Sequence, residues 1–538
     1  MTPYVAESFS AEERNILRRY FTDLDGPVFA LVNLPEVVKG ALFARYSRSA
    51  KSLRQLFLDE FMGELDVAGD VTVDATVGLE RAEALYDKVF LEYGDDSVAQ
   101  LGGVHLACEQ ASNVLTKILE WGRLMAYLEQ STRYIAYDTR LGGRYRYFRD
   151  PEILASPMGA RYIGDMDRIF DVYGELLPIM TDHFRDLIPK AREDSDFIYR
   201  QAIRAKAFDA LRGLLPAASL SNVGIYGTGQ GYEQLLLRMR AHPLPEARAY
   251  ADMMLVELRK VIPSFLKRVD LADRGGEWSD YFSTNGSAIR EVSDRLLGDM
   301  SDMSGPSDSR VTLVDFDPDG EIKMVAAMLY STTHVPEQVL EDRVAAMSVD
   351  DRLAVIRAYV GERKNRRHKP GRALERLDYR FDVLSDYGAF RDLQRHRMLT
   401  IEWQDLSPRH GFVRPEAIGD AGALEVYDAA MELSSRLWTD LNEEMPAQAS
   451  YAVALAYRVR YTMQMNAREA MHLIELRSGQ QGHPSYRTVA QDMHHLIKDV
   501  AGHRAVAEMM TFVDHTEEAD LERIDAERRA ESKRSSIA

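Results

Sequence analysis

The triplet Arg395-His396-Arg397 places two guanidinium groups around an imidazole in the stretch RDLQRHRMLTIEWQD. Arginine carries a permanent charge on a planar fork of donors, so this triplet suits a phosphate group or an electron-rich ring. It follows the patterned segment LDYRFDVLSDYGAFRDLQ, which places it at the end of an ordered element. We therefore predict a binding site here, and a solvated basic helix face is the simpler alternative.

A second polar group lies in the stretch EQSTRY of the first half. Alternating residues of an extended segment point to one side, so Glu129, Ser131 and Arg133 would present an acceptor, a hydroxyl and a guanidinium together. The phenol of Tyr134 would lie beside them. This set could hold a nucleotide, with Ser131 and Arg133 on the phosphate and Glu129 on a sugar or base donor. A strand with a polar face is the alternative.

A third set lies in NAREAMHLIELR, whose residues are strong helix formers throughout. Helical spacing puts Asn466 and Arg477 nearly on one line, while Arg468 and His472 share another face. A helix with recognition groups on two faces cannot bury one of them in a simple core. We predict that it lies between two sites or subunits; a surface helix with stray polar residues is the alternative.

A basic run surrounds Pro370-Gly371 ahead of a predicted helix. A glycine-led helix start beside several arginines would suit a pyrophosphate, so we predict that Arg372 contacts a cofactor phosphate. A solvated basic loop explains the run almost as well. Its members are Arg363, Lys364, Arg366, Arg367, His368, Lys369 and Arg372.

The elements that must position these residues occur in the same order in the two halves of the sequence. An extended apolar run meets a short helical one at residues 29–49 and again at 311–333. A long element ending in an arginine-bearing segment spans 119–134 in the first half and 393–412 in the second. Each half finishes with what we interpret as a proline-marked pair of helices. Repetition on this scale indicates a duplicated domain rather than a solenoid.

The mixed strand and helix patterns predict an α+β fold, with two tandem domains that are each a twisted sheet flanked by long helices. A largely helical protein is the alternative. The predicted boundaries are a first domain at 1–269, a linker rich in Gly, Ser and Asp at 270–310, a second domain at 311–515 and a charged tail at 516–538.

Composition narrows the class of protein. With 538 residues, 46% of them apolar and 28% charged, the chain resembles ordinary soluble proteins of several domains. Its net charge of −18 argues against broad binding of nucleic acid or anionic membranes, so an anionic ligand needs a local basic pocket. The single cysteine, Cys108, excludes a disulfide framework, and we expect a buried structural thiol and no metal site. Without a signal-peptide pattern or a long apolar run, we expect a cytoplasmic protein.

The motifs resemble those of the flavin-dependent thymidylate synthases, the ThyX family. Arg395-His396-Arg397 with a following Ser/Thr-containing loop, and the pattern N-x-R-x3-[NH]-x4-R over residues 466–477, match the family's spacing. In the first half, EQSTRY is similar to the family's deoxyuridylate-binding loop, and Gly94-x-x-Ser97 to its turn near the flavin. The resemblance covers most of both halves.

The resemblance implies that FAD, with NADPH and methylenetetrahydrofolate as co-substrates, converts dUMP to dTMP. It implies that the triplet contacts flavin and that Arg395 also reaches the nucleotide, while Arg477 binds the ionised N3 edge of the uracil. The remaining implied flavin contacts are Asn466, Arg468, His472 and Ser97. No cysteine nucleophile is needed, which agrees with a structural Cys108.

Each half departs from the family pattern where the other half keeps it. The first half has Trp121-Gly122-Arg123 in place of the triplet, with Thr228 and Gln230 at the late-helix Asn and Arg positions. The second half has Trp403 where the nucleotide loop has Glu. Because family sites form at junctions of a homotetramer, we predict a composite site built from both halves, in a homodimer that forms a pseudo-tetramer. A non-catalytic flavin- or nucleotide-binding pseudoenzyme and a helical interaction protein are the alternatives.

Overall fold

The protein divides into two compact units, each of which contains segments from both halves of the sequence. Unit 1 comprises Met1–Gly174, Leu215–Met303 and Ala429–Val453, and unit 2 comprises Glu175–Leu214, Ser304–Asp428 and Ala454–Ala538. Each unit therefore takes one segment from the opposite half, and the predicted boundaries describe the sequence repeat rather than the packing. The computed structural model describes residues 4–34, 36–61, 102–133, 135–192, 194–298, 309–516 and 528.

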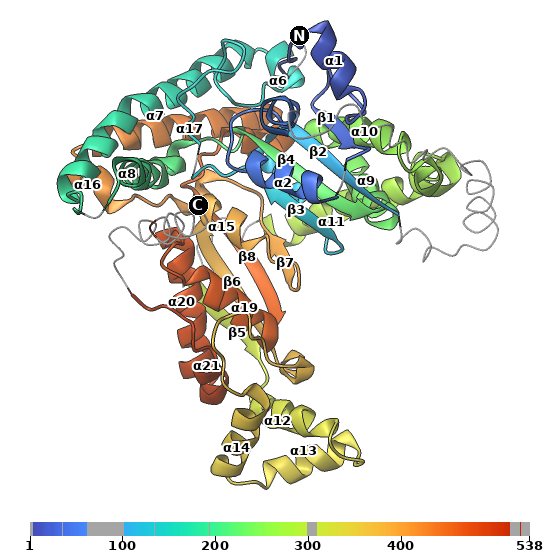
Figure 1. The fold of residues 1–538 in the computed structure, drawn as a ribbon, viewed down its shortest axis with the longest axis vertical. Helices are drawn as coiled ribbons and strands as arrows, with labels where there is room; N and C mark the ends of the chain where they lie inside the picture. Colours follow the sequence, from blue (N-terminus) through green and yellow to red (C-terminus); the bar gives the residue numbers. More distant parts are fainter. Residues whose placement is uncertain are drawn as a thin grey trace. The chain divides into compact units, whose positions relative to one another are not determined.

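Unit 1 contains a four-stranded antiparallel sheet in the order β1-β2-β4-β3 (Figure 1). Helix α9 packs on β4, and α10 packs on β1 and β2. The strands are β1 Val28–Leu31, β2 Gly103–Ser112, β3 Met125–Glu129 and β4 Leu220–Thr228, and the helices are α9 Gly229–Arg240 and α10 Pro245–Arg259.

Unit 2 repeats this topology, with strand order β5-β6-β8-β7 and every neighbouring pair antiparallel (Figure 1). Helix α20 packs on β5 and β6, and α19 contacts β6 and β8. The shared order confirms the α+β prediction for two tandem repeats, and the largely helical alternative is wrong. The elements are β5 Val311–Phe316, β6 Asp378–Asp386, β7 Thr400–Trp403, β8 Arg458–Asn466, α19 Ala467–Arg477 and α20 Pro484–Asp499.

The central strand β8 follows from a period-two pattern. In RVRYTMQMN, Val459, Tyr461, Met463 and Met465 are buried while the residues between them are exposed or half-buried. Strand geometry sends successive side chains to opposite faces, so this alternation fixes which face meets the core. The predicted proline-marked helix pairs are therefore wrong in part, because their alternating stretches form β4 and β8 and only the ends form α9 and α19.

Part of the predicted linker is also helical. Residues Glu277–Leu297 form α11, which buries none of its side chains. The Gly, Ser and Asp residues that indicated a loop are tolerated there because they face solvent. The other helices of the described chain are α1 Ala11–Leu17, α2 Glu36–Tyr46, α3 Leu53–Leu56, α5 Asn113–Leu119, α6 Pro151–Ala155, α7 Gly159–Leu187, α8 Asp196–Leu211, α12 Gly320–Tyr330, α13 Glu337–Ala345, α14 Val349–Val360, α15 Tyr387–Leu393, α16 Glu416–Asp420, α17 Leu424–Glu444, α18 Pro446–Ala449 and α21 Arg504–Met509.

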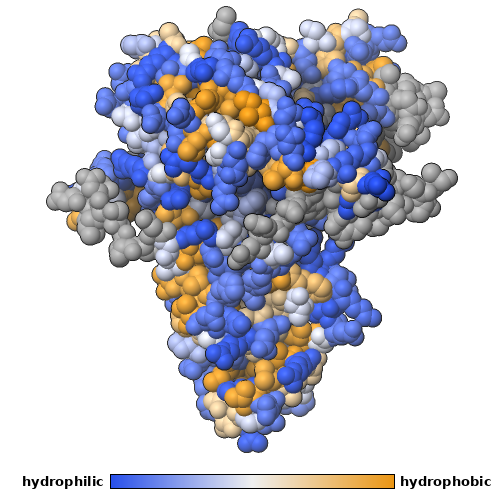
Figure 2. All heavy atoms as spheres, turned by 90° about the vertical axis from the view of Figure 1, so that its left-hand side faces the viewer, coloured by the Kyte–Doolittle hydropathy of each residue, from blue (hydrophilic) through white to orange (hydrophobic). Residues whose placement is uncertain are grey.

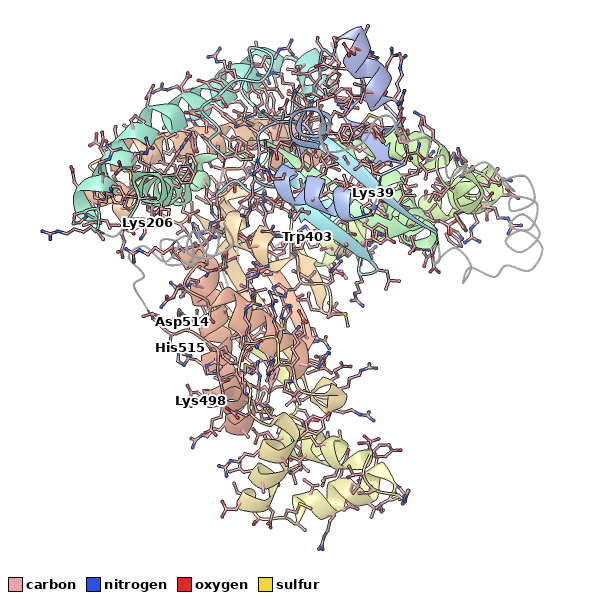
Figure 3. All side chains as sticks on the ribbon, viewed as in Figure 1. Lys39, Lys206, Trp403, Lys498, Asp514 and His515 are labelled. Atoms are coloured by element: carbon pink, nitrogen blue, oxygen red, sulfur yellow. The ribbon has the colours of Figure 1, made fainter. Side chains whose placement is uncertain are left out.

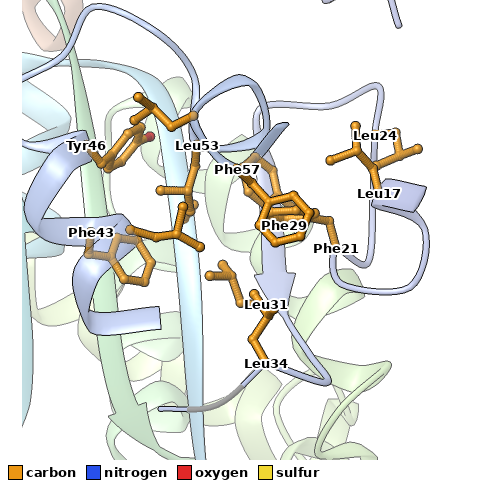
Figure 4. Close-up of a cluster of buried hydrophobic side chains, with 13 residues drawn as sticks. Leu17, Phe21, Leu24, Phe29, Leu31, Leu34, Phe43, Tyr46, Leu53 and Phe57 are labelled. Atoms are coloured by element: carbon orange, nitrogen blue, oxygen red, sulfur yellow. The ribbon is translucent and has the colours of Figure 1, made fainter. Parts of the chain in front are cut away.

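Apolar side chains between β1 and helices α1 to α3 form a core cluster in unit 1 (Figure 4). Phe21 lies edge-on to both Phe29 and Phe57, with ring centroids 5.6 and 5.5 Å apart. Outside such cores, hydrophilic side chains dominate the face in Figure 2, as the charge content predicts. Among the described residues, no helix combines the length and the apolar character that crossing a membrane requires.

A C-terminal strap, defined here as residues 510–516, lies along unit 2. The Asp514 amide donates to Ser478 Oγ at 3.1 Å, just beyond the end of α19. His515 Nε2 lies 3.1 Å from Nδ1 of His494 on α20. Figure 3 labels Asp514 and His515 on this flank of the unit. The strap thus joins the C-terminal end of α19 to the side of α20.

Candidate functional site

The triplet Arg395-His396-Arg397 begins two residues after the seven-residue helix α15. In unit 1, Trp121-Gly122-Arg123 begins two residues after the seven-residue helix α5. Both helices directly follow the second strand of their sheets, and side chains cap both: Ser112 accepts from the Leu115 amide, and Asp386 from the Ala389 amide. The two triplets therefore occupy equivalent positions in the repeat, as their sequences predict.

Helix α19 carries the late motif and begins where β8 ends. Asn466 is its N-cap, and its side-chain oxygen accepts from the Glu469 amide at 2.9 Å. Arg477 is its last residue. The helix predicted for this segment therefore forms, and Asn466 has a capping role in addition to any ligand contact.

His396 is the buried centre of the site, and both of its ring nitrogens are engaged. Nδ1 lies 3.0 Å from Oε1 of Glu469, and Nε2 accepts from Arg477 Nε at 3.0 Å. The ring of His472 lies edge-on, with centroids 5.4 Å apart. Burial lowers the pKa of His396 well below its ordinary value, and the charges of Arg477 and Arg395 add to this effect. His396 is therefore neutral at physiological pH.

His396, Glu469 and His472 have ligand atoms within 4.8 Å of one another, close enough to hold a metal ion. Proton counting argues against that use. Arginine can only donate, so Arg477 occupies the lone pair on Nε2 of His396. A neutral imidazole then carries its proton on Nδ1, which leaves no lone pair there for a metal. A bound ion would require an imidazolate, and positive neighbours surround the cluster.

Cationic side chains crowd this end of unit 2. The charge of Lys369 lowers the pKa of both His396 and His472, which places all three close together. Burial lowers the pKa of His472 to about 4, and partial burial lowers that of Lys369. Within the described chain, the side chains of Arg366, Lys369 and Arg397 have no ion-pair partner. An acidic protein thus concentrates positive charge here, with Glu469 and Glu475 as the nearby carboxylates.

Two further cations of the cluster are already paired. Arg468 Nε donates to the Pro370 carbonyl at 2.9 Å, and its guanidinium lies 3.4 Å from Glu375. Arg395 pairs with Asp392 three residues earlier. These contacts orient both guanidinium groups before a ligand binds to them.

A residue from the first half of the sequence supports the triplet inside unit 2. Arg212 Nη1 lies 3.4 Å from Oδ2 of Asp392, whose other oxygen holds Arg395. Arg212 also lies against Gly388, where an added Cβ would come within 3.2 Å of its guanidinium. Sequence analysis missed both Arg212 and Asp392, because neither belongs to a motif and their meeting depends on tertiary packing.

The basic run divides into a structural part and an exposed part. Arg363 is buried and pairs with Glu475 through two bonds of 2.6 Å. Arg372 is exposed and pairs with Glu375 at 2.9 Å. The predicted helix after Gly371 is only the 3-10 turn Arg372–Arg376. The Tyr359 hydroxyl accepts from the Ala373 amide at 3.2 Å, so this amide is already engaged, and the phosphate contact of Arg372 stays a prediction.

In unit 1 the predicted nucleotide residues lie at the end of β3. Glu129 is its last residue, buried beside Lys117 with 3.1 Å between Nζ and Oε2. The chain leaves the strand there, and Ser131 and Arg133 follow in a turn whose Arg133 amide donates to Ser131 Oγ at 3.2 Å. The continuous extended segment predicted for EQSTRY is therefore wrong beyond Glu129. Tyr134 and Ser97 lie outside the described residues.

In unit 1, the residues Trp121-Gly122-Arg123 that replace the triplet make contacts with nearby side chains of the same unit. The Arg238 guanidinium lies 4.9 Å from the centroid of the Trp121 ring, and Tyr127 donates to the Gly122 carbonyl at 3.2 Å. Cys108 is fully buried, which raises the pKa of its thiol. His105, three residues earlier, faces the ring of Tyr226. The structural interpretation of Cys108 is thus confirmed.

Comparison with known proteins gives the family. The model of the thymidylate synthase complementing protein family matches residues 42–264 and again residues 312–503. The chain belongs to this family. The two matches fall one in each half, which confirms the tandem repeat that the sequence and the sheet topology both indicate.

Three relatives are similar to this chain over nearly its whole length. A UPF0159 protein of Chlamydia pneumoniae is 38% identical over 98% of both chains, and one of Chlamydia muridarum is 39% identical over 97% of this chain and 98% of its own. A UPF0159 protein of Thermoplasma acidophilum is 32% identical over 93% of this chain and 99% of its own. Among solved structures, the UMP/dUMP methylase PolB of Streptomyces cacaoi, bound with 5-Br dUMP, is 18% identical, with a TM-score of 0.30 over 38% of this chain and 94% of its own.

Proposed function

We propose that this chain is a flavin-dependent thymidylate synthase, which methylates dUMP reductively to dTMP with methylenetetrahydrofolate and NADPH. Membership in the thymidylate synthase complementing protein family supports a thymidylate synthase-like reaction. The observation that carries the proposal is the presence near His396 and His472 of three cations, Arg366, Lys369 and Arg397, that have no ion-pair partner among the described residues. Such a cluster in a protein of net charge −18 favours the binding of an anionic ligand at this position.

FAD fits this donor set because its pyrophosphate is a compact dianion. Arg366, Lys369, Arg397 and the oriented Arg468 would hold its phosphates through charge-assisted hydrogen bonds. Bound flavin would supply hydride transfer, which none of these side chains can perform. The half-buried His472, neutral because burial lowers its pKa to about 4, would be a hydrogen-bond partner for an uncharged ring.

Arg477 is the residue we propose to act on the pyrimidine. A guanidinium facing the N3 edge of uracil stabilises the negative charge that develops on the ring as C5 reacts. Burial lowers the pKa of Arg477, and removal from water strengthens its interaction with an anionic ring. Its Nε is bonded to His396, so its terminal nitrogens carry this role.

The first experiment measures bound flavin in the purified untagged protein by its absorbance spectrum. We expect a flavin spectrum, and we expect Lys369→Met to weaken FAD binding about tenfold or more, the effect of losing one charged hydrogen-bond donor. Arg343→Gln is the matched control, because Arg343 is an exposed cation on α13. If neither FAD nor dUMP binds to the wild-type protein, the proposal is wrong.

The second experiment follows dTMP formation from dUMP, methylenetetrahydrofolate and NADPH. We expect turnover in the wild-type protein and none in Arg477→Met. Bound flavin without turnover would identify a pseudoenzyme, the alternative that the sequence departures leave open. Light scattering tests the proposed homodimer, which has twice the chain mass of 61.1 kDa.

A further inference from the structure

Glu469 and His396 form a buried chain of hydrogen bonds that ends on Arg477. Glu469 Oε1 lies 3.0 Å from His396 Nδ1, and His396 Nε2 lies 3.0 Å from Arg477 Nε. All three belong to unit 2, and the side chains of His396 and Glu469 are 3% and 9% exposed. The resemblance implies a direct flavin contact for His396, yet both nitrogens of its ring are engaged within the protein.

The direction of each bond in this chain follows from the chemistry of its members. Arg477 Nε–H can only donate, so Nε2 of His396 must accept. The low pKa of His396 keeps the ring neutral, so its one proton is on Nδ1 and is donated to Glu469. Glu469 is the only member that can select this tautomer, because the other tautomer would direct an N–H at Arg477.

We propose that Glu469 and His396 are positioning residues for Arg477, rather than flavin ligands. The carboxylate fixes the His396 tautomer, and the imidazole lone pair then fixes the rotation of the guanidinium. This arrangement commits Nε of Arg477 to His396 and leaves its terminal nitrogens, in a guanidinium that lies 5.5 Å from the centroid of the Tyr486 ring, for a ligand. The identity of that ligand rests on the proposed function, whereas the hydrogen bonds that link Glu469, His396 and Arg477 do not depend on it.

The arrangement resembles other sites in which an acid orients an imidazole, but here the imidazole orients a cation. The charges around Glu469 agree with these hydrogen-bond directions. Burial raises the pKa of Glu469, and the positive charges of Lys369 and Arg468 counter this rise, so the carboxyl group accepts in the centre of a cationic cluster. A ring protonated at Nε2 would instead oppose two positive charges and lose the bond to Arg477.

Two substitutions of Glu469 separate positioning from folding. Glu469→Gln retains a carbonyl oxygen that can accept from Nδ1–H, whereas Glu469→Met has a similar size and no acceptor. Glu321→Gln is the stability control, because Glu321 accepts from two amides at the start of α21 in the same unit. Each variant is compared by thermal unfolding, by dUMP affinity from pH 6 to 9, and by a crystal structure without ligand.

In Glu469→Met we expect the 3.0 Å bond between Arg477 and His396 to be lost in the crystal structure. We expect dUMP affinity to fall roughly 10- to 100-fold, the effect of one charged hydrogen bond, and Glu469→Gln to recover most of it. Removal of the carboxylate takes away a negative neighbour of His396 and leaves the cations, so the ring stays neutral and the residual dUMP affinity of Glu469→Met should not change with protonation of His396 between pH 6 and 9.

The proposal is overturned if Arg477 keeps its orientation in Glu469→Met, or if Glu321→Gln reduces dUMP affinity as much as Glu469→Met does. It is also overturned if Glu469→Gln is as impaired as Glu469→Met. If the wild-type protein binds no dUMP, the proposed function fails, while the orientation of Arg477 in the ligand-free crystals still decides the positioning role.

Discussion

Breaking the buried ion pair between Arg363 and Glu475 should destabilise unit 2 and disorganise the cation cluster. Their side chains are 3% and 1% exposed, and two bonds of 2.6 Å join them. Arg363 also donates to the carbonyls of Met509 and His368, each at 2.7 Å. The pair fastens the loop that carries Lys369 to helix α19, so its loss affects both parts of the site.

The expected magnitude follows from which charge is left buried. Glu475→Gln leaves the Arg363 guanidinium without its counterion, which costs about 3–5 kcal/mol of folding free energy. Replacing both residues with Met removes both charges and leaves the carbonyls of His368 and Met509 and the amide of Phe512 without partners, at about 1 kcal/mol each. The double variant should therefore cost about 3 kcal/mol, well below the sum of the two single changes.

Hydrogen exchange of the α19 amides measures this stability locally, which is preferable because a chain of two units need not unfold in one step. Arg372→Met is the control, since Arg372 pairs with Glu375 at the surface, where an ion pair contributes about 1 kcal/mol or less. A cost below about 1 kcal/mol for Glu475→Gln would refute the reasoning. So would a double variant whose cost equals the sum of the two single changes.

Three other predictions concern pH and the division of labour between the halves. Burial raises the pKa of Glu246 from 4.5 to about 7, so the folded protein should lose roughly 3 kcal/mol as pH rises through that interval, and Glu246→Gln should abolish this dependence in thermal unfolding. Burial lowers the pKa of both His515 and His494, so the strap should be held in place above pH 6.5 and released as pH falls below it. The protection of its amides should drop on acidification in the wild type, and this drop should be smaller in His515→Gln, where only His494 still titrates. The composite-site hypothesis requires Arg133→Met and Arg477→Met each to abolish dUMP binding, and it is wrong if either variant keeps full affinity.

The sequence alone predicted the repeat and the elements that carry the site. Two extended-then-helical starts became β1 with α2 and β5 with α12, because short apolar strands and amphipathic helices are encoded locally. The RHR triplet and the late helix were placed correctly at the ends of α15 and β8. The central strands were misassigned as parts of helix pairs because proline and helix formers flank their alternating residues.

Other features depended on packing between segments far apart in the chain. No local pattern indicated that residues 175–214 would join unit 2, or that residues 429–453 would join unit 1. In the sequence, the basic run forms one continuous patch. In the structure, Arg363 instead pairs with Glu475, which lies 112 positions later in the chain. Glu469 lies in the first turn of α19, a common place for an acid, and only the tertiary structure showed its contact with His396.

The sequence by itself determined the chemistry available here: arginines, histidines and a late helix whose spacing matches a family of thymidylate synthases. Only the tertiary structure decided which cations are committed to internal partners and which are free for a ligand. The reason is physical. Side-chain type fixes charge and donor count, whereas burial and neighbours fix pKa, tautomer and orientation. For His396, those surroundings turned a residue of a basic triplet into a neutral acceptor for Arg477.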